Sequence, residues 1–179
     1  SIKHMKIENS ALDVAISLVG AELQSIKSVE TGKEYLWQGD PEFWARRAPL
    51  LFPVVGQLKG DAYKIGEESY SLGKHGFARD SAFDVVKWNP TEIVLSLKSS
   101  PETYTSYPFH FDFRVGYRLE ENSIIQSFEV INTDSQTLPF SFGAHPAFNA
   151  NPIDGHYITF DQNEDQESVI IEDGVRGDK

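Results

Sequence analysis

Cysteine is missing from this chain of 179 residues. Its absence excludes disulfide bonds, thiolate metal ligands and cysteine nucleophiles. Long apolar runs are missing as well, because no window approaches the roughly 18 consecutive apolar residues of a membrane-spanning helix. Residues 1–10 are mostly polar and lack the apolar segment of a signal peptide. We therefore expect no membrane partner, and cytoplasmic residence is the default expectation.

Positive charge is scarce in this sequence. The chain has 16 Lys and Arg residues against 27 Asp and Glu residues, which gives a formal net charge of −11. Nucleic acids bind through clusters of basic residues, and no such cluster occurs here, so we expect no nucleic-acid partner. The 40% hydrophobic and 12% aromatic content is typical of a folded globular protein. This length predicts one domain, over residues 5–179, with residues 1–4 a tag remnant ahead of Met5.

Alternation of apolar and polar residues is the dominant pattern. It is clearest in residues 111–119, where the odd positions are apolar and most even positions are polar. Such alternation predicts strands with one buried face. We expect further strands at residues 14–18, 83–88, 93–98, 124–131 and 157–160, and a hairpin across residues 63–72. Antiparallel sheets with one apolar face pack on each other, so the sequence predicts an all-β fold, a β-sandwich.

Helix signals are few. Asp40-Pro41-Glu42 and Ser100-Pro101-Glu102 each offer a capping residue, a proline at the first helical position and an early acid. We expect short helices there, ending before Pro49 and Pro108 respectively. The acidic tail, residues 161–179, reads as a loop with one further strand around Val169–Ile171. A sandwich that stopped there would leave strand edges open, which favours a homodimer as one possibility.

Two histidine-bearing turns are the strongest chemical signals. His145 precedes Pro146, which biases its backbone towards an extended conformation, and an imidazole can donate a proton near neutral pH. Its expected aromatic neighbours, of the kind that pack against a sugar ring, are Phe140, Phe142 and Phe148. The alternative is a histidine that only packs a turn. Proton transfer on a hydroxyl-rich ligand is the functional interpretation.

The second turn carries His75 between Gly73 and Gly76, followed by Arg79. Glycines let a ligand approach the backbone closely, and a guanidinium can donate two hydrogen bonds to hydroxyls or to a phosphate. The alternative is a glycine-rich loop with a solvated arginine. His110 and His156 are interpreted as ordinary surface residues.

Motifs for other chemistries are absent. The sequence has no His-x-His, no His-Glu-x-x-His, no P-loop, no dinucleotide glycine motif and no Gly-x-Ser-x-Gly. We expect no metal and no cofactor.

Three segments together resemble the aldose 1-epimerase (mutarotase) family, most closely its LacX-like branch. They are residues 48–56 (Ala-Pro-Leu-Leu-Phe-Pro-Val-Val-Gly), 75–79 (His-Gly-Phe-Ala-Arg) and 143–148 (Gly-Ala-His-Pro-Ala-Phe). The segments occur in family order, and the resemblance covers residues 5 to about 160. It implies a galactose-mutarotase-like β-supersandwich and interconversion of the α and β anomers of a hexose or hexose phosphate, with no cofactor.

The resemblance also implies residue roles. His145 matches the histidine that protonates the ring oxygen, and His75 matches a substrate-contacting histidine. Arg79 is implied as a contact to hydroxyls or phosphate. Gln57 stands where the family commonly has an arginine; it can still hydrogen-bond a sugar, and Arg46 or Arg47 could supply the charge.

A second departure concerns the catalytic base, which in this family is a glutamate near the C-terminus of a longer chain. Nothing after Phe160 matches that segment, and neither Glu172 nor Asp173 has the matching setting. The sequence therefore predicts a domain that is incomplete at its C-terminus. Whether this chain alone has epimerase activity is left open by the sequence. The alternative function is a non-catalytic carbohydrate-binding module, since binding needs no base.

Overall fold

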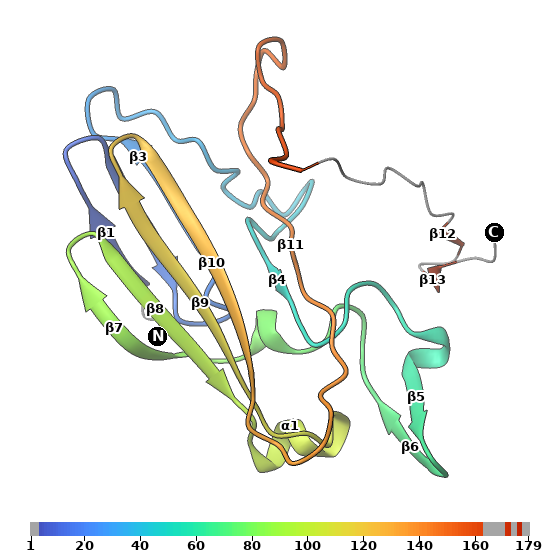
Figure 1. Cartoon of the computed structure of the whole chain (residues 1–179). Coiled ribbons are helices and arrows are strands. Elements are labelled where there is room, and N and C mark those ends of the chain that lie inside the picture. Colours follow the sequence, from blue (N-terminus) through green and yellow to red (C-terminus); the bar gives the residue numbers. More distant parts are fainter. Residues whose placement is uncertain (1–3, 163–170, 173–174, 177–179) are drawn as a thin grey trace.

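The computed structural model describes residues 4–162, 171–172 and 175–176, and it is built almost entirely of strands (Figure 1). The strands are β1 (His4–Glu8), β2 (Leu12–Ser17), β3 (Leu23–Ser28), β4 (Leu50–Leu51), β5 (Ala62–Ile65), β6 (Glu68–Ser71), β7 (Asp84–Asn89), β8 (Glu92–Lys98), β9 (Phe111–Glu120), β10 (Ser123–Asn132), β11 (Gly143–Ala144), β12 (Ile171–Glu172) and β13 (Val175–Arg176). The described helical segments are α1 (Pro101–Ser106) and two 3₁₀ turns, η1 (Lys59–Asp61) and η2 (Ala78–Asp80).

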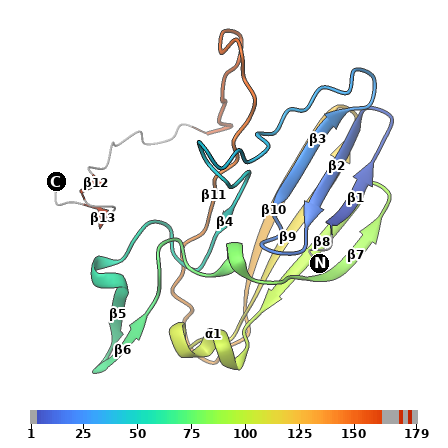
Figure 2. The same ribbon diagram turned by 180° about the vertical axis from the view of Figure 1, so that it is seen from behind.

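Two antiparallel sheets pack against each other to form the core. One has the order β1-β2-β3 and the other the order β10-β9-β8-β7, and the first lies in front of the second in Figure 2. The register places Ile93 opposite Tyr117 and Leu95 opposite Val115, so the apolar sides of β8 and β9 share one face. Buried side chains of that face join buried residues of β1 and β2 in one cluster: Ile7, Val14, Ile16, Ile93, Leu95, Val115 and Tyr117. The predicted all-β sandwich is confirmed.

The two predicted helices have different outcomes. The prediction at Ser100 is confirmed. The Ser100 hydroxyl accepts a hydrogen bond from the Thr103 backbone N–H, and the Thr103 hydroxyl accepts one from the Ser100 backbone N–H, which forms a capping box for α1. The prediction at Asp40 is wrong. The chain makes only a turn, in which the Asp40 carbonyl accepts from the Trp44 N–H at 2.8 Å. The N–H groups of Arg47 and Ala48 then donate to the Glu22 carboxylate, at 3.1 and 2.9 Å, instead of continuing a helical ladder.

The predicted strand at residues 157–160 is also wrong. Tyr157 and Ile158 are 85% and 84% exposed, and no strand is assigned to these residues. Alternation of apolar side chains makes a strand only where a neighbouring strand supplies backbone partners, and the described residues supply none at this point. Val169 and Ile170, from the other strand predicted in the tail, lie outside the described residues, and Ile171 begins β12.

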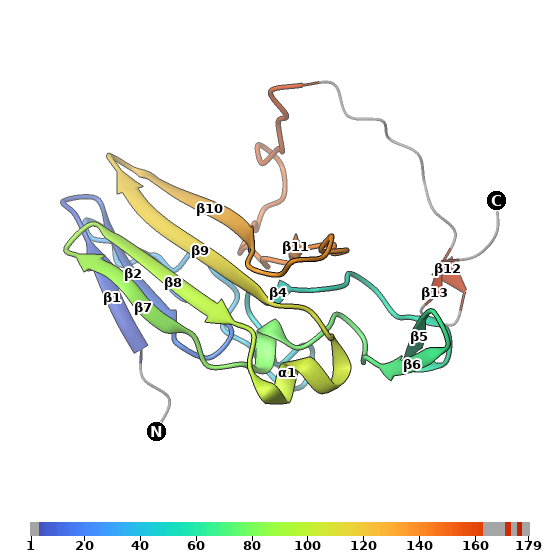
Figure 3. The same cartoon turned by 60° about the horizontal axis from the view of Figure 1, so that its bottom comes forward.

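Outside the two large sheets, short pairings hold the irregular segments. β11 pairs with β4, which it lies beside in Figure 3, while the β5–β6 hairpin stands apart from both large sheets. Leu36 forms an isolated bridge with Phe148. No helix among the described residues has the length and apolar character needed to cross a bilayer.

Candidate functional site

The two histidine turns meet on one backbone segment, residues 49–56, which we call the central segment. On one side the His145 N–H donates to the Pro49 carbonyl at 3.1 Å, next to the β4–β11 pairing. On the other side the N–H groups of Phe77 and Ala78 donate to the Phe52 carbonyl at 3.0 and 3.2 Å. Three sequence motifs that are far apart in the chain are therefore adjacent in space.

The turn that carries His75 has an uncommon backbone. His75 itself has a positive φ of 64°, and Gly76 follows with a φ of 70°. A Cβ atom at Gly76 would lie 2.2 Å from the Phe52 carbonyl oxygen, so only glycine lets the turn approach the central segment this closely. The close approach fixes the position of the neighbouring imidazole.

Two hydrogen bonds orient the His75 ring. Its backbone N–H donates to the Gly56 carbonyl at 2.8 Å, and its Nδ1 accepts from the Gly56 N–H at 2.9 Å. A neutral imidazole that accepts at Nδ1 carries its proton on Nε2. Nε2–H is then a hydrogen-bond donor available to a ligand.

The surroundings of His75 keep it neutral. Partial burial lowers the pKa of His75 below its ordinary value of 6.5, and the positive charges of Arg79 and Lys74 lower it further, with smaller contributions from His145 and Arg46. Protonation would also break the bond from the Gly56 N–H. His75 is therefore suited to donate a hydrogen bond near neutral pH, and unsuited to release a proton.

A cavity of about 390 Å³ opens between the two turns. Its walls combine one indole, two imidazoles and three cationic side chains; it is lined by Trp44, Ala45, Arg46, Pro49, Leu51, Lys74, His75, Arg79 and His145. The His145 ring packs on Trp44 with ring centroids 4.9 Å apart and an angle of 49° between the planes. The size suits a small ligand, and the indole offers an apolar face for one side of it.

The aromatic wall was expected from different residues, and that expectation is wrong. Phe142 packs on Phe128 with ring centroids 5.1 Å apart, and Phe140 lines a separate apolar cavity together with Tyr107. Phe148 lines a third hollow, described below. Neighbours in sequence point to different sides of an extended chain, so proximity to His145 along the chain does not bring these rings to its imidazole.

Of the residues predicted for the site, the structure brings His75, Arg79 and His145 to this one cavity. Arg47 and Gln57 are not among the residues that line it. The Arg47 guanidinium donates from Nη1 to the Gln24 carbonyl at 2.7 Å and to Gln38 Oε1 at 2.9 Å. The Gln57 amide donates to Asp61 Oδ1 at 3.1 Å.

Two aromatic or charged lining residues, Lys74 and Trp44, were not singled out from the sequence. Lys74 directly precedes His75, and that adjacency was the available signal. Trp44 follows the turn that had been predicted as a helix, so its direction could not be read from a helical pattern. Arg46, considered only as a substitute for the missing arginine, does line the cavity.

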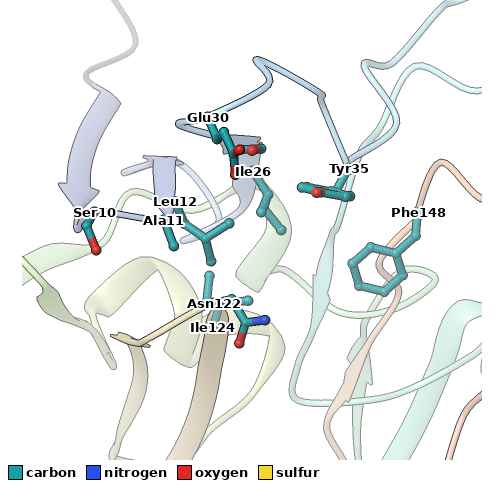
Figure 4. Close-up of a pocket in the computed structure, with 10 residues that line it drawn as sticks. Ser10, Ala11, Leu12, Ile26, Glu30, Tyr35, Asn122, Ile124 and Phe148 are labelled. Carbon is teal, nitrogen blue, oxygen red and sulfur yellow. The ribbon is translucent and has the colours of Figure 1, made fainter.

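A larger hollow of about 580 Å³ lies elsewhere on the molecule. Figure 4 shows aliphatic side chains such as Leu12, Ile26 and Ile124 on one side of it, with the rings of Tyr35 and Phe148 on the other. It contains no histidine, arginine or lysine. Within the part of the chain that the structure describes, no group of three or more metal-ligating side chains occurs. The histidine cavity is therefore the candidate functional site.

Residues 3–169 match the family model described as Aldose 1-epimerase, and the chain belongs to that family. It is 38% identical over 157 residues to the plasmid-encoded Protein LacX of Lactococcus lactis subsp. lactis, a match that covers 84% of this chain and 52% of the relative.

Solved structures agree with this assignment. The fold is similar to that of a galactose mutarotase related enzyme from Lactobacillus acidophilus, with a TM-score of 0.81 and 42% identity over 92% of this chain and 52% of that one. A galactose mutarotase-like protein from Lactobacillus casei gives a TM-score of 0.80 and 39% identity over 82% of this chain and 50% of that one. The chain thus spans about half the length of the relatives it matches.

Proposed function

We propose that this chain carries the acid and the substrate-orienting groups of an aldose 1-epimerase, which interconverts the α and β anomers of a hexose. The observation that supports it most directly is that His75 and His145 line one cavity from turns held by the same backbone segment. Membership of the aldose 1-epimerase family supports an isomerase of this kind.

The reaction needs an acid and a base. Removal of the proton from the anomeric hydroxyl and protonation of the ring oxygen open the sugar ring. Rotation about the C1–C2 bond and closure on the other face give the opposite anomer. In this proposal His145 delivers the proton to the ring oxygen, neutral His75 donates from Nε2 to a sugar oxygen, and Trp44 packs against an apolar face of the ring.

The described residues that line the cavity do not supply the base. Among the described residues that line the cavity, none is an aspartate or a glutamate. We infer that a carboxylate other than the described lining residues completes the acid–base pair.

Anomer exchange, followed by polarimetry or by NMR exchange spectroscopy, tests the proposal on the product of the complete reading frame. We expect accelerated exchange for at least one hexose or hexose phosphate. The His145→Asn variant should lower kcat by about 10²–10⁴-fold with little change in KM, as expected for loss of a positioned acid. Arg118→Gln, on the exposed end of β9 and paired with Glu120, is the control that should leave kcat unchanged. No acceleration for any sugar in a hexose panel would refute the proposal.

A second candidate is a carbohydrate-binding protein without catalysis. The same observation, that no described carboxylate lines the cavity, favours it. Calorimetric titration with a sugar panel, combined with the anomer-exchange assay, separates the two functions. Sugar binding with an unchanged rate of anomer exchange supports the binding protein, and accelerated exchange refutes it.

A further inference from the structure

The segment that carries Trp44 has no regular structure of its own. Residues 37–49 contain neither a helix nor a strand. The Asp40 carbonyl accepts from the N–H groups of Phe43 and Trp44, at 3.1 and 2.8 Å, and these bonds make only a turn. An aromatic side chain on such a segment keeps one orientation where bonds to other parts of the chain hold its backbone. The place of the indole in the candidate site therefore depends on what holds this turn.

Trp37 holds the turn through its side chain. Its Nε1–H donates to the Trp44 carbonyl at 2.8 Å, so the bond ends on the backbone of the residue that carries the indole. Phe43 packs edge-on against the Trp37 ring, with ring centroids 6.3 Å apart and an angle of 78° between the planes. Trp37 thus contacts the turn at two points, a hydrogen bond to Trp44 and a ring contact with Phe43.

The backbone of Trp37 is bonded to the segment that carries His145. The Trp37 N–H donates to the Ala147 carbonyl at 2.9 Å. The Ala147 N–H donates in turn to the Arg47 carbonyl at 2.9 Å, and the His145 N–H donates to the Pro49 carbonyl at 3.1 Å. Trp37 is therefore bonded on one side to the turn of Trp44 and on the other side to the segment of His145.

These bonds meet at the contact between the indole and the imidazole. The Trp44 and His145 rings lie with their centroids 4.9 Å apart. Trp37 is not among the residues that line the cavity, so its influence on the site passes through its two bonded neighbours. Loss of the Nε1–H group would leave the Trp44 carbonyl without this donor and would release the backbone from which the indole projects.

We propose that Trp37 is a positioning residue of the candidate site: its bond to the Trp44 carbonyl holds the indole against His145 and thereby orients the imidazole that delivers the proton. This inference rests on the proposed function and adds to it a residue that makes no contact with the sugar. A displacement of about 1 Å in a reacting group can lower a rate by about 10²-fold, so an effect of this kind is measurable in turnover.

The NMR signal of the His145 Hε1 proton tests the positioning without any ligand. The ring current of an indole shifts the resonance of a nearby proton, so this signal, assigned with His145→Asn, reports on the place of Trp44. Trp44→Leu gives the position of the signal without the indole. We expect Trp37→Phe, which keeps a ring but removes the N–H donor, to move the signal most of the way to that position.

Trp88→Phe is the matched control. Trp88 Nε1 also donates to a backbone carbonyl, that of Lys6 at 3.0 Å, but Trp88 belongs to β7 and does not line the cavity. The substitution therefore removes the same group from the same kind of bond at another place. It should leave the His145 signal unchanged.

A second variant decides the question if Trp37→Phe disturbs the fold. Replacement of Trp37 by benzothienylalanine, in which sulfur takes the place of the N–H group, removes the donor and keeps the shape of the ring system. It should move the His145 signal in the same direction as Trp37→Phe. The proposal is overturned if the signal stays in place in both Trp37 variants, if Trp88→Phe moves it as much, or if Trp44→Leu does not move it.

Kinetics on the product of the complete reading frame give a second readout. Trp37→Phe should lower kcat for anomer exchange by about tenfold or more, with a smaller change in KM because the Trp44 ring is kept, and Trp88→Phe should leave both unchanged. An unchanged kcat in the Trp37 variant would also overturn the proposal. The NMR signal needs neither a sugar nor turnover. A complete protein that does not accelerate exchange therefore refutes the epimerase proposal, while the spectra still decide whether Trp37 positions the two rings.

Discussion

His75 is the residue whose titration reports most directly on the site. Burial and the adjacent Arg79 and Lys74 lower its pKa, so we expect its NMR titration midpoint below 6.5. The folded chain then binds this proton less readily than the unfolded chain, and the contribution of His75 to the free energy of unfolding declines as the pH falls below about 6.5.

Arg79→Gln is the variant that tests this account. Removing the guanidinium charge should raise the midpoint of His75 towards its ordinary value, whereas Arg118→Gln, whose guanidinium pairs with Glu120, should not move it. A midpoint that is unaffected by the Arg79 substitution would show that the charge cluster does not act on the imidazole.

Gly76 and Gly66 have similar positive φ angles, of 70° and 60°, but different surroundings. Gly76→Ala should destabilise the fold by at least about 3 kcal/mol, because the new Cβ would meet the Phe52 carbonyl oxygen at 2.2 Å. Gly66→Ala, at a φ of 60° in the β5–β6 turn with nothing within 4 Å, should cost only about 1 kcal/mol. Denaturant unfolding measures both, and similar losses would mean that the contact with the central segment is unimportant.

At the scale of elements, α1 depends on its capping box. The helix is only six residues long, so tertiary contacts and the cap must stabilise it. Ser100→Ala should lower the free energy of unfolding by about 1 kcal/mol, since the Thr103 N–H loses its acceptor. Thr105→Ala, an exposed position in the same helix, should change it by less than about 0.5 kcal/mol. Equal effects in chemical denaturation would count against the cap.

The elements also show where local sequence signals succeed. The capping pattern at Ser100 predicted α1 correctly. Its capping box joins Ser100 and Thr103, which are only three residues apart, so the sequence contains both partners. The same pattern at Asp40 did not produce a helix, because the Glu22 carboxylate, distant in sequence, accepts the N–H groups of Arg47 and Ala48. The two segments share a capping residue, a proline and an acid, but Phe43, three residues after Asp40, cannot close a box as Thr103 does.

At the scale of the whole molecule, Tyr117 ties β9 to the connection between β2 and β3. Its hydroxyl, buried on β9, donates to the Ala21 carbonyl at 2.5 Å and accepts from Gln126 Nε2 at 2.9 Å. Tyr117→Phe should cost about 1–2 kcal/mol, because the Ala21 carbonyl is left without this donor in the core. Tyr104→Phe, at an exposed ring, is the matched control and should be nearly neutral. A Tyr117→Phe variant with unchanged stability would show that this buried hydroxyl does not stabilise the fold.

The sandwich could be read from the sequence because period-two alternation over residues 111–119 already specifies the buried face of β9. The histidine cavity could be read only in part. His75, Arg79 and His145 were identified from their motifs and by resemblance, but Trp44 reaches the site through a turn with no regular pattern. Arg47 was predicted to contact the ligand because of its charge, but it does not line the cavity. Its guanidinium donates instead to the Gln24 carbonyl and to the Gln38 side chain.

The main-chain bonds of residues 49–56 also bear on how this protein can vary. Since both histidine turns are attached to that one segment, the spacing of the two imidazoles is set locally and does not depend on how the loops between the motifs run. The β5–β6 hairpin lies in such an intervening stretch and stands away from the sheets (Figure 3). Insertions or deletions in that hairpin can therefore accumulate while the separation of the two rings stays the same.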